Sequence, residues 1–220
     1  MWAVVFDLDG VLVDTAKLHA EAWRRLAEEL GISLSEEFLR SLRGLNRMDS
    51  LDRILEWGGR TEVGTAERER LAEQKNLWYV GSLEHLTPRD VLPGVVELLD
   101  GLASYGVPVA VASSSKNARL VLERTGLAKR FSVVVDGNAV LRAKPDPTIF
   151  LEAFRRLGVS PRNGVVVEDA ASGVEAARRA GARVVGVGRS EELPGADLVV
   201  SDLRELTVDR LRALVDSAAF

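Results

Sequence analysis

Short apolar runs recur along the chain, together with segments of helical periodicity. Residues 2–6 form a continuous apolar run that ends at Asp7, which is typical of a strand buried on both faces. Five further strand-like runs follow, at 107–112, 132–135, 164–167, 183–187 and 198–200. Helical patterns accompany them, at 95–104, 118–125, 148–157, 173–180 and 208–218. This alternation predicts an α/β core in which a Rossmann-like parallel sheet carries helices on both faces.

The stretch after the first strand has a different pattern. Its apolar residues have helical spacing, beginning with Leu18, Ala22, Leu26 and Leu30, and Gly31 is a typical helix stop. Further helical patterns follow at 38–42, 51–57 and 68–80, with no convincing strand among them. We therefore predict an α/β core formed by residues 1–14 and 88–220, and a small helical domain inserted at residues 15–87.

Polar residues that could bind a ligand or take part in catalysis follow the predicted strands. In an open α/β sheet, ligands bind beyond the carboxyl ends of the strands, so these residues are expected to meet at one edge. They are Asp7 and Asp9 after the first strand, the loop from Ser113 to Asn117 after the second, Lys144 after the third, and Glu168 and Asp169 after the fourth.

The acids in this group suggest a metal site. Asp7 and Asp9 are two residues apart on an extended segment, so their side chains are expected to face the same pocket. Neighbouring carboxylates repel one another unless a cation or a shared proton compensates, and oxygen ligands without His or Cys favour Mg²⁺ over Zn²⁺. The predicted magnesium site involves Asp7, Asp9, Glu168 and Asp169. The alternative is a set of capping or loop acids on a solvated face.

The loop after the second strand is a candidate phosphate site. Its members Ser113, Ser114, Ser115, Lys116 and Asn117 supply hydroxyl groups, one amine and the predicted start of a helix. Hydroxyls, free backbone N–H groups and a helix dipole together favour a bound phosphate. Simple N-capping by Ser115 would explain one serine. It would not explain Lys116, because a cation at a helix start is unfavourable without an anionic ligand.

Composition narrows the function classes. The 220 residues carry a net charge of −4, which argues against a general nucleic-acid binder. The chain contains no cysteine, which excludes disulfides and thiolate metal sites and permits a cytoplasmic location. Neither a signal peptide nor a membrane-spanning stretch is recognisable. We expect a soluble, cytoplasmic, monomeric protein with no nucleic-acid or membrane partner.

The segment from Asp7 to Thr15, the Ser/Lys loop, Lys144-Pro145 and Glu168-Asp169 resemble the four ordered motifs of the haloacid dehalogenase-like superfamily. The resemblance covers the whole chain, and the helical insert resembles the small α-helical cap of that superfamily. It implies that Asp7 carries phosphate as an aspartyl phosphate. It also implies Mg²⁺ as the cofactor, bound by the Asp7 side chain, the Asp9 backbone carbonyl and Asp169, with Glu168 ordering the metal's waters.

The same resemblance assigns roles around Asp7. Ser113 and Lys144 would hold the oxygens of the transferring phosphoryl group and stabilise the transition state electrostatically. Asp9 would be the general acid and base for a sugar hydroxyl. Thr15 and His19, near the hinge of the cap, would position Asp9 when the cap closes.

Within the superfamily, the cap resembles that of the β-phosphoglucomutases. Thr15 to His19 followed by Trp23 resembles their first cap helix, and Arg43-Gly44 with Arg47 resembles their substrate-gripping loop. Two departures are Arg43, where lysine is usual, and Ala170, where serine is common. The implied substrate contacts are His19, Trp23, Arg43, Gly44, Arg47, Lys75, Ser114, Ser115, Lys116 and Asn117.

Each cap residue also has a simpler reading. His19 can be the partner of a structural hydrogen bond, and Trp23 lies on the apolar stripe with Leu26, where core packing is a serious alternative. Arg43, Arg47 and Lys75 can be solvated surface charges. Their position in the cap, where a second phosphate would need cations, favours the functional reading.

The resemblance implies a small phosphosugar substrate and interconversion of β-glucose 1-phosphate and glucose 6-phosphate through a bisphosphate intermediate. The nearest alternative is a sugar-phosphate or phosphoglycolate-type phosphatase, which would use the same Asp7, Asp9 and metal but transfer the phosphoryl group to water. A receiver-type signalling module is less favoured, because such modules carry their phospho-accepting aspartate after the third strand and lack a large insert.

Overall fold

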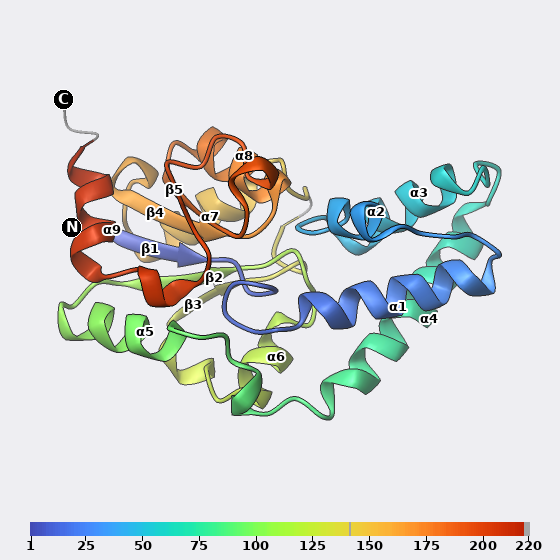
Figure 1. The fold of residues 1–220 in the computed structure, drawn as a ribbon, viewed down its shortest axis with the longest axis horizontal. Coiled ribbons are helices and arrows are strands. Elements are labelled where there is room, and N and C mark those ends of the chain that lie inside the picture. Colours follow the sequence, from blue (N-terminus) through green and yellow to red (C-terminus); the bar gives the residue numbers. More distant parts are fainter. Residues whose placement is uncertain (141, 218–220) are drawn as a thin grey trace.

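The computed structural model describes residues 1–140 and 142–217. Its centre is a sheet of six parallel strands in the order β3-β2-β1-β4-β5-β6 (Figure 1). The predicted α/β core is therefore confirmed. The strands are β1 (Ala3–Phe6), β2 (Val109–Ala112), β3 (Val133–Val135), β4 (Gly164–Glu168), β5 (Arg183–Val187) and β6 (Leu198–Val200).

Alternate residues of the buried strands face two separate apolar clusters. Val4 and Phe6 of β1 pack with helices α5 (Val95–Ser104), α6 (Ala118–Arg124) and α9 (Val208–Asp216). Ala3 and Val5 pack with α7 (Thr148–Leu157) and α8 (Ala171–Ala180) on the opposite face. The period of two along a strand thus places helices on both faces, as predicted.

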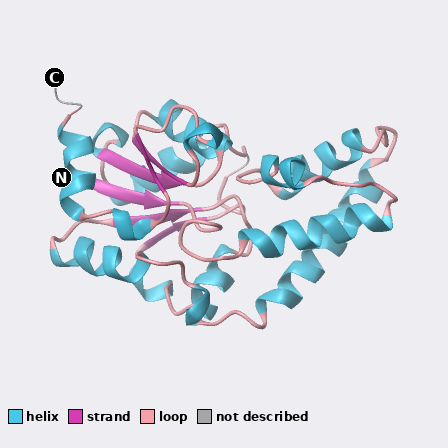
Figure 2. Ribbon diagram, in the orientation of Figure 1, coloured by secondary structure: helices cyan, strands magenta, loops and turns pink. Residues whose placement is uncertain are grey.

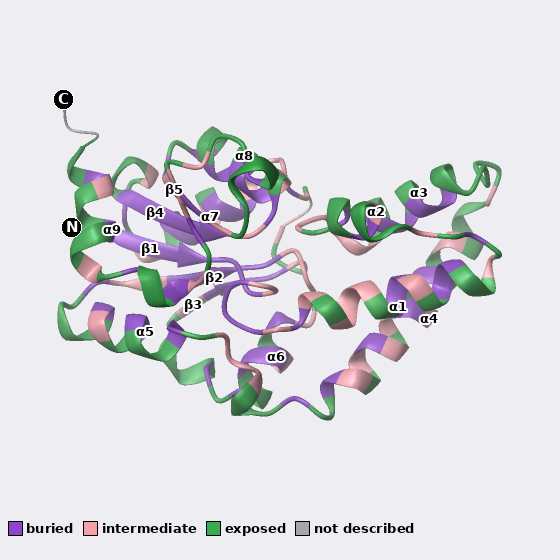
Figure 3. Ribbon diagram, viewed as in Figure 1, coloured by how far each residue is buried: buried purple, intermediate pink, exposed green. Residues whose placement is uncertain are grey.

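The insert is helical. It contains α1 (Ala16–Glu29), α2 (Glu36–Ser41), α3 (Arg47–Trp57) and α4 (Thr65–Leu83), and the described residues between 15 and 87 form no strand (Figure 2). The four helices share an apolar cluster of their own that includes Trp23, Leu26 and Leu51. Each of these four helices has buried residues that belong to this cluster, and exposed residues as well (Figure 3). The helices lie beyond the carboxyl end of β1, where the site was predicted (Figure 1).

The predicted element ends are accurate in the core and less so in the insert. The predicted ends of β5, β6, α5 and α7 match the structure. Strand β4 runs one residue further than predicted, so Glu168 belongs to the strand. Helix α3 begins earlier than predicted because the Asn46 side chain caps it, accepting a hydrogen bond from the Asp49 N–H (2.8 Å). Ala218, the predicted end of the last helix, lies outside the described residues.

None of the helices in the described part of the chain is long and apolar enough to cross a membrane.

Candidate active site

A cavity of about 650 Å³ lies between the strand ends and the helical insert. A volume of this size suits a small organic ligand. Thirteen predicted site residues line it: Asp7, Asp9, His19, Trp23, Arg43, Gly44, Arg47, Lys75, Ser113, Ser114, Ser115, Lys116 and Asn117. Four others do not line the cavity: Thr15, Lys144, Glu168 and Asp169. The side chains of the first three are buried, and that of Asp169 is 6% exposed.

Lys144 joins the ends of three strands, β1, β2 and β4, through its ammonium group. Its Nζ donates to Asp7 Oδ1 at 2.5 Å, to Glu168 Oε1 at 2.6 Å and to the Ala112 carbonyl at 3.3 Å. Burial alone would lower the pKa of Lys144, but the carboxylates of Asp7 and Glu168 outweigh that effect and raise it. The side chain therefore stays charged beside Asp7, where a phosphoryl group would be held.

Glu168 is committed to internal contacts on both of its oxygens. Oε1 accepts from Lys144, and Oε2 accepts from the Ala170 N–H at 2.8 Å. Gly173 makes room for this carboxylate, because a Cβ at that position would lie 1.8 Å from Glu168 Oε1. The predicted role of Glu168 in ordering the waters of a metal stays a prediction.

The charges at this edge fit a divalent cation. Asp7, Glu168 and Asp169 are enclosed, and among the described residues the cations that contact them are Lys144 and the more exposed Arg43 (3.4 Å from Asp169). Burial raises the pKa of Asp169 well above its usual range, and the charges of Glu168 and Asp7 add to this. A bound cation would reduce the repulsion between these buried carboxylates. Their oxygen donors are the ligands that Mg²⁺ prefers.

No cluster of three or more His, Cys, Asp or Glu side chains arranged to hold a metal occurs among the described residues. The predicted magnesium site does not need such a cluster, because only two of its direct ligands are side chains. Two of its direct ligands are the side chains of Asp7 and Asp169, whereas the third is the backbone carbonyl of Asp9.

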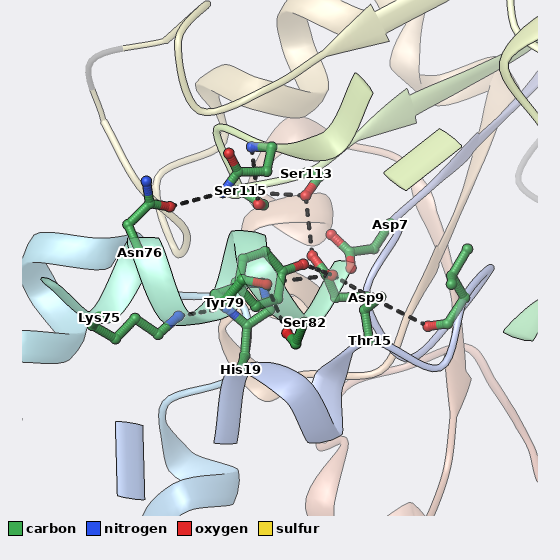
Figure 4. A network of polar contacts seen from close by, with 12 residues as sticks. Asp7, Asp9, Thr15, His19, Lys75, Asn76, Tyr79, Ser82, Ser113 and Ser115 are labelled. Carbon is green, nitrogen blue, oxygen red and sulfur yellow. Dashed lines mark hydrogen bonds and ion pairs between the residues drawn. The ribbon is translucent and has the colours of Figure 1, made fainter. Parts of the chain in front are cut away.

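Several polar groups converge on Asp9 (Figure 4). Thr15 Oγ1 donates to its Oδ1 at 2.5 Å, and Tyr79 Oη does so at 3.4 Å. His19 Nε2 lies 3.6 Å from the same oxygen, while Ser113 Oγ donates to Oδ2 at 3.4 Å. Burial, reinforced by the charge of Asp7, raises the pKa of Asp9 to about 6. A carboxyl group with this pKa can both give and take a proton near neutral pH.

A second group of side chains surrounds His19. Its ring stacks on Tyr79 with 3.8 Å between the centroids, and its Nδ1 lies 2.8 Å from Lys75 Nζ (Figure 4). Burial and, to a smaller extent, the charge of the nearby Arg47 together lower the pKa of Lys75 to about 7. Burial and Lys75 hold the pKa of His19 well below its usual range. A neutral imidazole can therefore accept from Lys75 through Nδ1.

Trp23 fills two roles. It is buried in the apolar cluster of the insert, so the packing reading is correct. It also lines the cavity, and Lys75 Nζ lies 4.6 Å from the centre of its ring.

The serines after β2 have separate hydrogen-bonding roles. Ser113 Oγ accepts from the Ser115 N–H (3.1 Å), and Ser115 Oγ accepts from the Asn117 N–H (3.2 Å). The capping interpretation is therefore wrong for Ser115, because the N-cap residue of α6 is Asn117 and no side chain caps the helix; the Ser115 hydroxyl stabilises the turn before it. The Ser114 hydroxyl donates to the Gly44 carbonyl of the insert at 2.7 Å, although the resemblance implied a substrate contact for it.

Arg47, the first residue of α3, is held by two residues of α4. Its Nη1 donates to Glu73 at 3.2 Å, and its Nη2 donates to Asn76 Oδ1 at 2.7 Å. Asn76 Oδ1 also accepts from Asn117 Nδ2 at 3.0 Å, so it joins the insert to the core. A guanidinium at a helix N-terminus is a suitable seat for an anion.

Sequence reasoning missed Asn76 and Tyr79 as members of the site. A signal for Tyr79 was present, because residues four apart share one face of a helix. Lys75 and Tyr79 have this spacing in α4, as His19 and Trp23 have in α1. Asn76 lies three residues before Tyr79 in the same helix, a spacing that also places residues on one face.

This fold is that of the haloacid dehalogenase-like hydrolases. The chain belongs to that family, and residues 4–187 match it.

Known relatives cover nearly the full chain. The sequence is 41% identical over 212 residues to a β-phosphoglucomutase of Bacillus subtilis, covering 96% of this chain and 94% of that protein. The crystal structure of a β-phosphoglucomutase from Clostridium difficile is similar with a TM-score of 0.94 and 39% identity, covering 99% and 98% of the two chains. A phosphorylated carbohydrates phosphatase of Thermotoga maritima is 37% identical over 85% of each chain.

Proposed function

We propose that this chain is a Mg²⁺-dependent phosphomutase that interconverts β-glucose 1-phosphate and glucose 6-phosphate through a hexose bisphosphate. One observation carries the proposal. A single cavity has Asp7 and Asp9 among its lining residues together with the cations Arg47 of the insert and Lys116 of the core. A bisphosphate has two anionic ends, so it needs a second cationic seat besides the reacting one. The similarity to β-phosphoglucomutases supports the assignment.

Asp7 is the proposed nucleophile. A carboxylate oxygen of Asp7 attacks phosphorus of a hexose bisphosphate, the bond from phosphorus to the sugar oxygen breaks, and the phosphoryl group remains on Asp7. Lys144, 2.5 Å from Asp7, and Ser113 hold the oxygens of this group. Mg²⁺ bound by the Asp7 and Asp169 side chains and the Asp9 carbonyl would supply positive charge against the repulsion between nucleophile and phosphate.

Asp9 is the proposed general acid and base. It gives a proton to the sugar oxygen that leaves and takes one from the hydroxyl that attacks next. With a pKa of about 6, both protonation states are accessible near neutral pH. Thr15, His19 and Tyr79 hold its carboxylate in place through the contacts described above.

The insert at residues 15–87 is proposed to act as a cap domain on the core at 1–14 and 88–220. Arg47, Lys116 and Asn117 would hold the phosphate that is not being transferred. Lys75 and His19 would contact the sugar, while Trp23 shapes the wall beside them. One chain supplies all of these groups, so a monomer suffices.

The deciding experiment is phosphorus NMR of the protein with Mg²⁺, β-glucose 1-phosphate and a trace of hexose bisphosphate. Formation of glucose 6-phosphate is the expected result. Release of inorganic phosphate without isomerisation would instead favour a sugar-phosphate phosphatase, an alternative supported by the similarity to the carbohydrate phosphatase.

Arg47→Ala tests the second phosphate seat. We expect isomerisation to fall by roughly 10²-fold or more, because a paired guanidinium–phosphate contact is lost. Hydrolysis of a small aryl phosphate should be spared, since that substrate has no second phosphate. Arg53→Ala, on the same helix but exposed, is the matched control. Equal losses of both activities in Arg47→Ala would contradict the assignment.

A further inference from the structure

Two serine hydroxyls from separate parts of the core bind consecutive carbonyl groups of the insert. Ser172 Oγ, in the first turn of α8, donates to the Arg43 carbonyl at 3.2 Å. Ser114 Oγ, in the loop after β2, donates to the Gly44 carbonyl at 2.7 Å. Both acceptors belong to the backbone, so these contacts fix the path of the loop and do not depend on its side chains.

The close approach of this loop depends on small residues. Gly44 has a φ of +74°, a conformation that favours glycine. A Cβ at this position would lie 2.5 Å from Ser172 Oγ and 3.1 Å from the Cβ of Ala170. The departure at Ala170 thus puts a methyl group directly beneath the cap loop, and the loop packs against it.

From these contacts we propose that Ser114 and Ser172, which we name the serine seat, are positioning residues. They hold the cap loop at Arg43 and Gly44 against the core while Asp7 carries phosphate. The seat thereby determines whether a sugar hydroxyl or water receives the phosphoryl group. This inference rests on the proposed function and deepens it.

The two outcomes share one electrophile. In each, an oxygen attacks phosphorus and the bond from phosphorus to Asp7 breaks. When the attacking group is a hydroxyl of the hexose monophosphate, its proton passes to Asp9 and the hexose bisphosphate forms. When it is water, inorganic phosphate forms and the proton goes to Asp9 or solvent. The chemistry at Asp7 is the same, so access of water to the cavity decides the ratio.

The seat is a better candidate for this control than the ion pair between Arg40 and Glu192. Arg40 of α2 forms an ion pair at 3.6 Å with Glu192 of the short helix η4 (Ser190–Glu192). Both side chains are more than a third exposed. Exposed pairs of this kind contribute little. The Ser114 contact is shorter and only partly exposed, and it lies at the cavity wall.

The test is the ratio of inorganic phosphate released to isomer formed, measured in one sample by phosphorus NMR. Ser114→Ala and Ser172→Ala should each raise this ratio roughly three- to tenfold, the factor expected for one lost hydrogen bond. The double variant should raise it further, and Ser172→Thr, which keeps the hydroxyl, should restore the wild-type ratio. Ser104→Ala, which removes a hydroxyl of α5 on the core surface, is the matched control.

An unchanged ratio in the double variant would overturn the serine seat, as would equal losses of isomerisation and hydrolysis with a lowered unfolding temperature. A wild-type chain that forms no isomer would instead overturn the proposed function. In that case the seat is judged from the lifetime of the Asp7 phosphate formed with acetyl phosphate. A shorter lifetime in the double variant than in the wild type would support the serine seat, and an unchanged lifetime would contradict it.

Discussion

The carboxylate of Asp9 is the side chain on which the polar contacts of the site converge. Thr15 from the start of the insert, Tyr79 from α4 and Ser113 from the core all donate to it. It is nevertheless held close to Asp7 and largely away from water, which raises its pKa to about 6. A group placed in this way is useful for proton transfer but lowers the stability of the fold when it ionises.

Asp9→Asn should therefore change the pH dependence of stability. The pKa of Asp9 is higher in the folded than in the unfolded chain. The stabilisation that the protonated carboxyl group gives the folded state is therefore fully present below about pH 4 and is lost as the pH rises through about 6. Without Mg²⁺, the variant should gain stability relative to the wild type across this window, by about 1–3 kcal/mol at pH 7. Urea unfolding between pH 4 and 8 measures this.

Asp209→Asn is the control for that experiment, since it removes a carboxylate at an exposed position of α9. A stability difference between wild type and Asp9→Asn that stays constant from pH 4 to 8 would contradict the assigned environment of Asp9.

Helix α4 is the element that brings the insert to the reacting groups. Lys75 and Tyr79 lie one turn apart on it and enclose His19, and Asn76 reaches both Arg47 and Asn117. The C-terminal part of the helix joins the core, because Tyr79 and Leu83 belong to the same apolar cluster as β1. Movement of α4 would therefore change the environments of His19, Arg47 and Asp9 together.

Lys75 gives this element a measurable response to substrate. Its pKa of about 7 in the free chain leaves it largely neutral at pH 8. A phosphate anion nearby would favour the charged form, so substrate binding at pH 8 should take up a fraction of a proton. Calorimetry in buffers of different ionisation enthalpy measures that uptake. It should disappear in Lys75→Met and persist in Lys17→Met, where the lysine is exposed.

At the scale of the whole molecule, the cavity is closed by contacts between parts that are distant in the sequence. Arg43 contacts Asp169, Ser114 binds Gly44, and Asn117 binds Asn76. The acids at the strand ends keep a charge imbalance that Lys144 only partly offsets. A divalent cation would stabilise the folded chain by binding there.

Mg²⁺ should therefore raise the unfolding temperature. At a concentration 100 times the dissociation constant the gain is about 2.7 kcal/mol, or on the order of 5–10 °C for a chain of this size. Asp169→Asn should remove most of this gain, whereas Asp52→Asn, at an exposed position of α3, should retain it. Differential scanning calorimetry with Mg²⁺ and with EDTA is the measurement. An equal gain in all three proteins would place the metal elsewhere.

The sequence by itself determined the sheet and the place of the site. Uninterrupted apolar runs such as those of β4 and β5 have few alternatives to a buried strand, and parallel strands end at one edge. Asp7, Ser113 and Lys144 could therefore be brought together by reasoning along the chain. Helix starts in the insert were less accurate, because the first turns of α3 and α4 are polar and show no apolar period.

Only the tertiary structure decided which side chains of the site contact one another. The partners His19 and Lys75 are 56 positions apart, and Arg43 and Asp169 are 126 apart. Such pairs depend on how each helix is rotated and placed, which the packing of the whole chain determines. The same holds for Tyr79 at Asp9, Asn76 between Arg47 and Asn117, and Ser114 at Gly44. A hydroxyl or amide can bind many partners, and its sequence position does not say which one folding brings within hydrogen-bonding distance.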